Sequence, residues 1–165
     1  MNVDLTSTDG LHTPLPLVVA NMTAISGRRM AETIARRGGI AILPQDIPAD
    51  FVARSIRRVK NAHTRFDTPV TVDPTTTVGE AMSLLNKRAH GVVLVVEDHH
   101  PVGLVSPAEA EGVDRFAQCH EVMTTDLTLV GPQASPDDVF QALAERHQKV
   151  AVAVDEDGVL VGIMT

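Results

Sequence analysis

The chain has no tryptophan, no tyrosine and only four phenylalanines among its 165 residues. Its core must therefore be aliphatic, and it has no aromatic platform on which the bases of a nucleic acid could stack. Long apolar runs are also missing, since stretches such as GVVLVV at 91–96 fall far below the roughly 18 residues that a membrane-spanning helix needs. These absences argue against nucleic-acid and membrane partners.

Cysteine is almost absent as well, because Cys119 is the only one. A single thiol cannot form an internal disulfide, and the N-terminus lacks the charged start and apolar stretch of a secretion signal. We therefore expect a cytoplasmic protein in which Cys119 is a small packing residue. No metal site is predicted, because four histidines lack Cys or acidic partners at ligand spacing: His90, His99, His100 and His120.

The charge is unevenly distributed, although an apolar fraction of 44% predicts an ordinary globular core. Residues 1–65 carry nine Lys and Arg against five Asp and Glu, a net charge of +4. Residues 66–165 carry five basic and sixteen acidic residues, a net charge of −11. This asymmetry predicts two units with different roles. The arginine pairs at 28–29 and 36–37 are expected to lie on the solvent face of an amphipathic helix rather than to contact nucleic acid.

The second unit contains an internal repeat. Residues 70–106 overlay residues 127–165 with two one-residue adjustments, so that VTV at the start of one copy matches LTL at the start of the other. Three residue pairs are matched further along the copies: Arg88 with Arg146, Val92 with Val150, and Gly103 with Gly162.

Each copy predicts a strand, a helix and then a hairpin. Thr77 and Ser135 are expected to cap the two helices, whose apolar residues recur at helical spacing. The valine-rich runs VVLVV and VAVAV predict strands, because β-branched side chains favour them. Polar turns follow each run, and Asp157-Gly158 is a strong signal for a hairpin turn.

This β-α-β-β pattern, present twice, resembles a tandem pair of cystathionine β-synthase (CBS) domains, the arrangement called a Bateman module. The resemblance places the first CBS domain at 67–119 and the second at 120–165, where HEVMTTD lies at the position in which such pairs begin their second copy. It implies an adenine or guanine nucleotide as ligand and a homo-oligomer built through the CBS pairs. Because this unit is strongly acidic, the nucleotide is expected to bind weakly, to bind with Mg²⁺, or not to bind, leaving only packing and dimerisation.

In the CBS family, a phrase of Gly, two apolar residues, Ser or Thr, two more residues and Asp forms part of the nucleotide pocket. The first copy has Gly103, Ser106 and Glu109, with Glu in place of the usual Asp, and the second has Gly162 and Thr165. The second copy shows neither its carboxylate nor its last helix, so we expect the chain to be part of a longer protein. The cations that can oppose the acidic charge are Lys87, Arg88, Arg115, Arg146 and Lys149.

Residues 1–65 alternate between strand and helix patterns. LPLVVAN (15–21) and GIAIL (39–43) are continuous apolar runs typical of parallel strands. The helix between them is expected to be capped by Ser26 and stopped by Gly38, which makes a right-handed parallel unit. Its predicted buried residues are Met30, Ala31, Ile34 and Ala35, and those of a second helix after Pro48 are Val52, Ile56 and Val59.

The string VVANMTAISGRRMAETIARRGGIAILPQD (18–46) resembles the start of the barrel in the IMP dehydrogenase and GMP reductase family. That family's pattern is an apolar strand, a small residue, Met, a helix with Met-Ala, and then Gly-Gly-Ile. Its dehydrogenases insert a Bateman module after the second barrel helix, as this chain does near residue 67. The fold implied is α/β: a partial βαβα fragment of a (β/α)8 TIM barrel at 1–66, followed by the α+β CBS pair.

The same resemblance places Ala20, Asn21 and Met22 at the substrate pocket, where the first barrel strand ends. Taken without the wider match, Asn21 and Met22 are ordinary loop-packing residues. The family usually has Ser at the position of Ala20, and the NMT and LPQD segments also depart from the dehydrogenase pattern, which indicates a divergent paralogue that reduces GMP.

Three hypotheses about function remain open. The first, which we favour, is the nucleotide-sensing regulatory part of an IMP dehydrogenase-like, NAD(P)-dependent oxidoreductase of guanine nucleotide metabolism. The second is a CBS assembly module that stands alone. The third, a small enzyme in its own right, is disfavoured because no nucleophile–base pair, cysteine loop or nicotinamide site can be assembled. We therefore expect no catalytic residue and no cofactor in this fragment itself.

Overall fold

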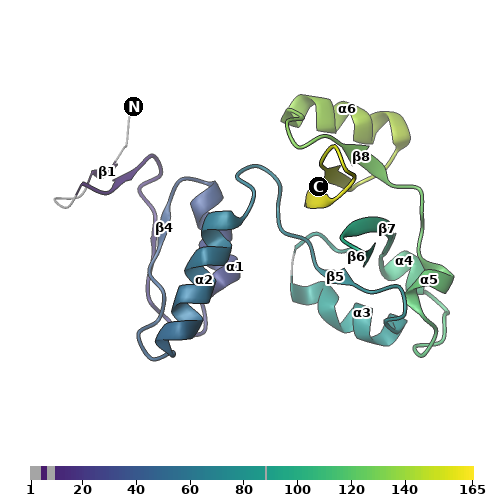
Figure 1. Cartoon of the computed structure of the whole chain (residues 1–165), viewed down its shortest axis with the longest axis horizontal. Coiled ribbons are helices and arrows are strands. Elements are labelled where there is room, and N and C mark those ends of the chain that lie inside the picture. The colour runs from purple at the N-terminus through teal and green to yellow at the C-terminus, as the bar shows by residue number, and fades with distance from the viewer. Residues whose placement is uncertain (1–4, 7–9, 88) are drawn as a thin grey trace. The chain divides into compact units, whose positions relative to one another are not determined.

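The computed structural model describes residues 5–6, 10–87 and 89–165 (Figure 1). The chain divides into two compact units, Met1–Arg65 and Phe66–Thr165. Each unit has its own strands and helices and is described by itself.

The first unit is a short antiparallel pair followed by a β-α-β-α segment. β3 and β4 pair in parallel, with Val18 opposite Ile40. The predicted order of strand, helix, strand and helix is therefore confirmed, whereas the antiparallel pair β1–β2 was not predicted. The elements are β1 (Leu5–Thr6), β2 (His12–Thr13), β3 (Val18–Val19), α1 (Arg28–Arg36), β4 (Ile40–Ala41) and α2 (Ala49–Asn61).

The beginning of α1 differs from the prediction. Gly27, not Ser26, is the N-cap residue, and it provides no side-chain cap. Ser26 is fully buried, and its hydroxyl donates a hydrogen bond to the carbonyl of Ile42 beyond β4. The predicted cap at Ser26 is wrong because this tertiary hydrogen bond holds the hydroxyl that a cap would need.

The buried faces of the two helices are narrower than predicted. Ala31 and Ile34 are buried in α1 as expected, but Met30 is 37% exposed. In α2, Ile56 is 42% exposed, whereas Ser55 is only 4% exposed. Two paired strands offer too little sheet surface to cover the full apolar stripes of both helices. Ala35 is also exposed, and Val52 and Val59 are half-buried.

The second unit contains the two copies in sequence. The first copy runs through β5 (Thr71–Val72), α3 (Val78–Leu84), the 3₁₀ turn η1 (Leu85–Lys87), β6 (Val93–Glu97), β7 (His100–Val105) and α4 (Pro107–Ala110). After α5 (Cys119–Val122), the second copy runs through β8 (Thr128–Val130), α6 (Pro136–Arg146), β9 (Ala151–Val154) and β10 (Leu160–Met164).

Both copies form the same three-stranded sheet. The strand orders are β5-β6-β7 and β8-β9-β10; in each, the first pair is parallel and the second antiparallel. Thr71 pairs with Leu94, and Leu129 pairs with Val152. Leu94 and Val152 are equivalent in the sequence overlay, so Leu129, not Thr128, corresponds to Thr71. The overlay of VTV on LTL is thus wrong by one residue.

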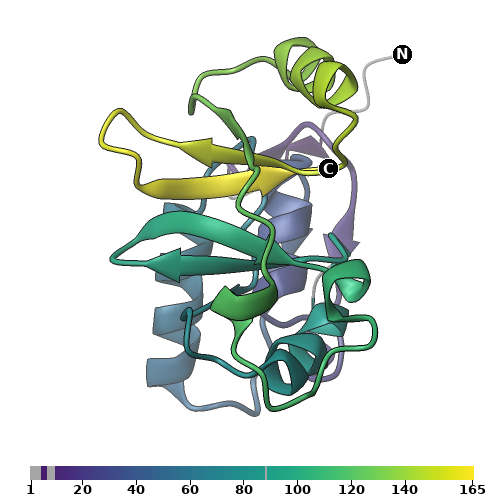
Figure 2. The same ribbon diagram turned by 90° about the vertical axis from the view of Figure 1, so that its right-hand side faces the viewer.

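The two hairpins lie against each other, with α3 outside one and α6 outside the other (Figure 2). Leu94 of β6 and Val152 of β9, both fully buried, belong to the cluster between the sheets. Ala81 of α3 packs on the outer face of the first sheet, and Val139 of α6 packs on that of the second. Each sheet is thereby covered on both faces, which explains its nearly continuous aliphatic strands.

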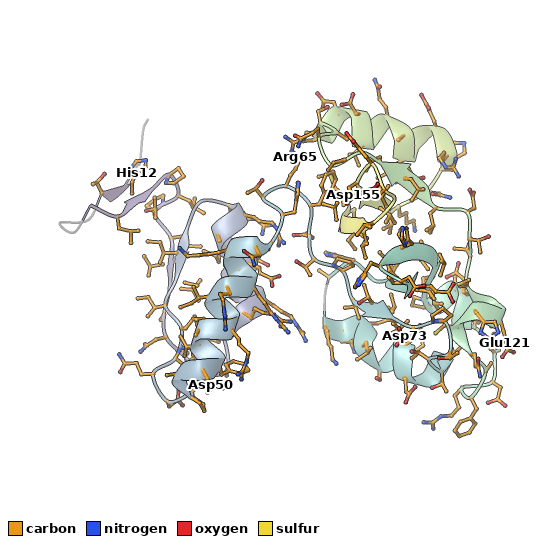
Figure 3. All side chains as sticks on the ribbon, viewed as in Figure 1. His12, Asp50, Arg65, Asp73, Glu121 and Asp155 are labelled. Carbon is orange, nitrogen blue, oxygen red and sulfur yellow. The ribbon has the colours of Figure 1, made fainter. Side chains whose placement is uncertain are left out.

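Local signals are confirmed in both copies. Thr77 and Ser135 accept hydrogen bonds from the backbone N–H groups of Glu80 and Asp138, so both helices start at the predicted caps. The β9–β10 turn begins at Asp155, which is labelled in Figure 3, and closes with a hydrogen bond from the Gly158 N–H to the Asp155 carbonyl.

Candidate functional site

A cleft of about 660 Å³ lies in the second unit, beside α4 and the residues that come just before β6 and β9. This volume is in the range of small-molecule pockets. Both copies contribute to its lining, so a ligand there would contact the two repeats together. Its polar side chains are His90, Ser106, Glu109, Thr124, Asp126, His147, Gln148 and Lys149.

Ser106 and Glu109, which the CBS resemblance predicts for nucleotide binding, both line this cleft and also bond to each other. The N–H of Ser106 donates to Oε2 of Glu109 at 2.8 Å, and the hydroxyl of Ser106 donates to the same oxygen. Ser106 in turn accepts from the Ala108 N–H at 3.2 Å, which completes a capping box at the start of α4. A ligand must therefore compete with a helix cap for these two side chains.

The pKa of the Glu109 carboxyl reflects this cap. Partial burial raises it, but the hydrogen bonds from the hydroxyl and N–H of Ser106 outweigh burial and lower the pKa below the ordinary value for glutamate. Glu109 is therefore a carboxylate at neutral pH, in the state that accepts hydrogen bonds from hydroxyl groups.

The opposite wall is organised by Asp126. Its carboxylate forms an ion pair with Arg146 at the end of α6. The amide of Gln148 donates to the carbonyl of Asp126 at 2.7 Å and to its Oδ2 at 3.1 Å. Gln148 also accepts a hydrogen bond from the hydroxyl of Thr128, which is only 2% exposed. This network joins the start of β8 to the end of α6 and fixes the wall.

The other residues predicted for nucleotide binding lie elsewhere. Gly103 and Gly162 are buried within their strands, and Thr165 is exposed after β10. None of the three lines the described cleft, and Arg146 reaches it only through Asp126. Arg88 lies outside the residues that the structure describes.

Sequence reasoning missed five polar residues of the cleft: His90, Thr124, Asp126, His147 and Gln148. His147 ends α6 in a left-handed conformation, with φ of 53°, and this turn brings Gln148 and Lys149 to the cleft. The polar segment between α6 and a buried strand was the available signal. It carries no recurring motif, however, and only the folded backbone shows where it lies.

The predicted barrel residues follow β3 in the first unit. Asn21 and Met22 line a shallow hollow together with Gln45 and Asp46, which follow the parallel strand β4. The hydroxyl of Thr23 donates to the two carboxylate oxygens of Asp46, at 3.0 and 2.8 Å, and ties the two loops together. Ala20 is exposed but does not line this described hollow. The loops that follow the carboxyl ends of these two parallel strands therefore meet at one edge of the sheet.

Comparison with known families covers nearly the whole chain. The model of the IMP dehydrogenase / GMP reductase domain matches residues 1–160. The chain belongs to the IMP dehydrogenase/GMP reductase family. This match extends through both units, so the family model includes the second unit as well as the first.

Curated members of the family match nearly the whole chain. A protein named GMP reductase in Mycobacterium tuberculosis is 46% identical over 99% of this chain and 34% of its own length. The inosine-5'-monophosphate dehydrogenase of Staphylococcus epidermidis is 26% identical over 95% of this chain and 33% of its own length. The chain thus spans about a third of the length of the curated relatives it matches.

A solved structure of the family shares the fold. GMP reductase from Trypanosoma brucei, in complex with guanosine 5'-triphosphate, matches with a TM-score of 0.68 and 23% identity, covering 98% of this chain and 41% of that one. A second structure of GMP reductase from the same organism matches with a TM-score of 0.56 and 22% identity, covering 99% of this chain and 40% of that one. Both support a mixed α/β fold for this family member.

Cys119 is the one cysteine of these 165 residues, and it is completely buried in the core of the first repeat. Burial, followed by the nearby charge of Glu80, raises its pKa, so the thiol stays protonated at neutral pH. Its predicted packing role is confirmed. Within the described residues, no group of three His, Cys, Asp or Glu side chains is arranged to hold a metal ion, and no helix is long and apolar enough to cross a membrane.

Proposed function

We propose that residues 66–165 form a CBS-domain pair, a Bateman module, which binds a purine nucleotide and regulates an oxidoreductase of the GMP reductase type. Three features support the CBS assignment: the repeated β-α-β-β order, identical strand pairing in both copies, and a cleft lined by both. The first unit is then the start of the catalytic (β/α)8 barrel, because its parallel pair and the loops after β3 and β4 fit the first barrel repeats.

The observation that carries the choice of parent enzyme is the difference in sequence identity. The M. tuberculosis protein named GMP reductase is 46% identical to this chain, whereas the dehydrogenase of Staphylococcus epidermidis is 26% and that of Aquifex aeolicus 27% identical. GMP reduction is therefore our proposal, with IMP oxidation as the alternative. In either parent NAD(P) would carry the hydride. The described residues offer no glycine-rich turn for a dinucleotide, so we assign that cofactor to the rest of the parent.

Steady-state kinetics of the parent enzyme tests this choice. GMP with NADPH should support turnover, and IMP with NAD⁺ should not. Turnover of IMP alone would make the alternative correct.

In the cleft, we propose that Glu109 and Asp126 accept hydrogen bonds from ribose hydroxyls and that Lys149 faces the phosphates. A carboxylate accepts two hydroxyl hydrogen bonds, which suits the two hydroxyls of a ribose. Because two carboxylates and one lysine line this cleft, phosphate binding should be weak or should require Mg²⁺. The GTP complex of the T. brucei relative supports a guanine nucleotide, and adenine nucleotides remain the second choice.

Calorimetry with GTP, GDP, ATP, ADP and IMP, with and without Mg²⁺, tests the cleft. Lys149→Ala should weaken nucleotide binding about tenfold through loss of one charge-assisted contact. Lys60→Ala, in the first unit, is the matched control and should leave binding unchanged. Glu109→Asp, which restores the residue usual in CBS domains, should tighten binding. Absence of heat with every nucleotide, or equal effects of the two lysine variants, would refute nucleotide sensing.

Assembly without a ligand is the second candidate, and exposed aromatic side chains favour it. Phe140 on α6 is 73% exposed, and Phe116 before α5 is 74% exposed. Large apolar side chains in such positions are typical of contacts between subunits. Analytical ultracentrifugation should show a homo-oligomer that Phe140→Ala weakens, whereas a concentration-independent monomer would exclude this role.

A further inference from the structure

The first unit contains an arginine-lined cleft that the proposed function does not use. It has a volume of about 590 Å³ and lies between the start of α1 and one face of α2. It includes none of Ala20, Asn21 and Met22, the residues predicted for the barrel substrate. We call it the arginine cleft, after its four arginines: Arg28, Arg29, Arg54 and Arg58.

The sequence directs these cations to one place. Phe51, Arg54, Ser55 and Arg58 are spaced i, i+3, i+4 and i+7, so they share one face of α2. Arg28 and Arg29 occupy the first turn of α1, which has no acidic residue and no side-chain cap from Gly27. Cations at a helix N-terminus oppose the helix dipole, whereas the first-turn N–H groups of α1 can donate to an anion bound beside them.

The negative charges nearby do not fill the cleft. Glu32 pairs with Arg28 at 3.6 Å, and Asp50, labelled in Figure 3 at the start of α2, pairs with Arg54 at 2.5 Å. Each of these carboxylates lies on the same helix as its arginine. Among the described residues that line the cleft, there is no carboxylate.

A largely buried serine adds a hydroxyl group to the wall of the cleft. Ser55 lines the cleft, and it is only 4% exposed. Within the part of the chain that the structure describes, no hydrogen bond engages its hydroxyl. Among the described residues, the Ser55 oxygen is not one of the fully buried atoms that lack a partner, so it is open to the cleft, where the hydroxyl can donate to an oxygen of a bound anion.

We propose that the arginine cleft binds the phosphoryl group of a small phosphorylated molecule. Guanidinium groups hold phosphate oxygens through paired hydrogen bonds, and the Ser55 hydroxyl and the first-turn N–H groups of α1 add further donors. The rest of the molecule would lie on the apolar side chains of the cleft. These are exposed in the free protein: Ile25 by 46%, Met30 by 37% and Phe51 by 49%.

Titrations of the whole chain followed by NMR test this site. The probes are inorganic phosphate, a nucleoside 5'-monophosphate and, as a carboxylate control, a hexaglutamate peptide. We expect the Ser55 amide to shift with the first two, and the monophosphate to bind more tightly because it also covers apolar surface. Inorganic phosphate binding as tightly as the monophosphate would show a site for the free ion and overturn the proposal of a larger ligand.

Matched variants distinguish a specific anion site from non-specific attraction between anions and the exposed arginines. Arg58→Ala should weaken binding about tenfold, whereas Arg57→Ala, an exposed α2 arginine outside the cleft, should change it by less than about twofold. Ser55→Ala should also weaken binding while leaving the free protein as stable as before, since an unpartnered hydroxyl contributes nothing to folding. Equal effects of the two arginine variants, hexaglutamate binding as tight as the monophosphate, or no saturation below about 10 mM would each overturn the proposal.

This test is independent of the nucleotide cleft in the second unit. Lys149→Ala should leave the Ser55 response unchanged, and Arg58→Ala should leave nucleotide heats at the second unit unchanged. A Ser55 response that disappears with Lys149→Ala would place the ligand in the other unit and refute the arginine cleft.

Discussion

Gly103 and Gly162 are each crossed by the backbone segment that leads into the opposite repeat. Leu104, next to Gly103, exchanges two hydrogen bonds of 3.0 Å with Thr124, just before β8. Ile163, next to Gly162, exchanges hydrogen bonds of 2.8 and 2.9 Å with Asp67, just before β5. The repeated glycine therefore allows two backbones to approach closely, and the last strand of each repeat is bridged by the segment that leads into the other repeat.

A methyl group at either glycine should destabilise the second unit. A Cβ on Gly162 would lie 2.8 Å from the Asp67 carbonyl and 2.7 Å from Cβ of Phe66. At Gly103 it would lie 2.5 Å from the flexible Sδ of Met123. Overpacking of this kind costs about 1–3 kcal/mol, and Gly162→Ala should cost more because its neighbours are rigid. Urea unfolding measures the free energy of unfolding of both alanine variants.

Gly131→Ala is the control for this pair, since nothing lies within 4 Å of its added Cβ. It should change the free energy of unfolding by no more than about 0.5 kcal/mol. Equal stabilities of the Gly162→Ala and Gly131→Ala variants would contradict the crossing as the reason for the repeated glycine.

Removal of Gln148 should destabilise the wall of the nucleotide cleft. Gln148→Ala leaves the hydroxyl of Thr128 buried without its acceptor, at a cost of about 1–3 kcal/mol. Thr128→Val combined with Gln148→Ala removes both partners and should be more stable than Gln148→Ala alone. Thermal unfolding of the wild type, the two single variants Gln148→Ala and Thr128→Val, and the double variant gives the coupling energy between the two side chains. Strictly additive effects would show that this hydrogen bond does not contribute to stability.

The helix cap at Ser135 should make stability depend on acid. The hydroxyl and N–H of Ser135 donate to Oδ2 of Asp138 at 2.7 and 2.9 Å, and these hydrogen bonds lower the pKa of Asp138. Because the pKa of Asp138 is lower in the folded state, the ionised carboxylate stabilises the fold at pH values above the ordinary aspartate pKa of 3.8. This stabilisation is lost as the pH falls through the pKa of the folded state. Asp138→Asn should therefore flatten the fall in the urea midpoint between about pH 5 and pH 3.

Asp137→Asn, one residue earlier, is the control for this acid dependence. Among the described residues, Asp137 has no hydrogen bond to Ser135, so its variant should keep the wild-type slope. A slope that flattens equally in both variants would show that acid acts through general charge rather than the cap.

Cys119 should be inert in the folded protein. Its thiol is fully buried, and its raised pKa reduces the reactive thiolate. Modification by iodoacetamide at pH 8 should be slower than in the urea-unfolded chain by about a hundredfold or more, since it requires an unfolding event. Fast labelling of the native protein would mean that the first repeat opens readily. Mass spectrometry measures both rates.

The features predicted correctly were those that depend on residues close to one another in the sequence. The caps at Thr77 and Ser135 depend on contacts three residues away, and the turn at Gly158 depends on local backbone geometry. Ser26 and Ile56 were mispredicted because a distant carbonyl and a narrow sheet, respectively, decide their environment. Local patterns cannot report such contacts.

The same limit applies to the candidate site. The CBS resemblance indicated Ser106 and Glu109, and both lie in the cleft. It gave no sign that they bind each other as a helix cap, nor that Gln148 would form the facing wall. Those facts arise where α4 starts and α6 ends, at points separated by many residues along the chain.

By itself, the order of residues determined that this chain contains a duplicated β-α-β-β segment, because apolar periodicity and capping residues act over a few positions. Only the tertiary structure decided which segments cross at Gly103 and Gly162, which side chains meet in each cleft, and that four arginines converge in the first unit. The physical reason is that chain connectivity directs short-range structure, whereas packing of distant segments places side chains that no local rule relates.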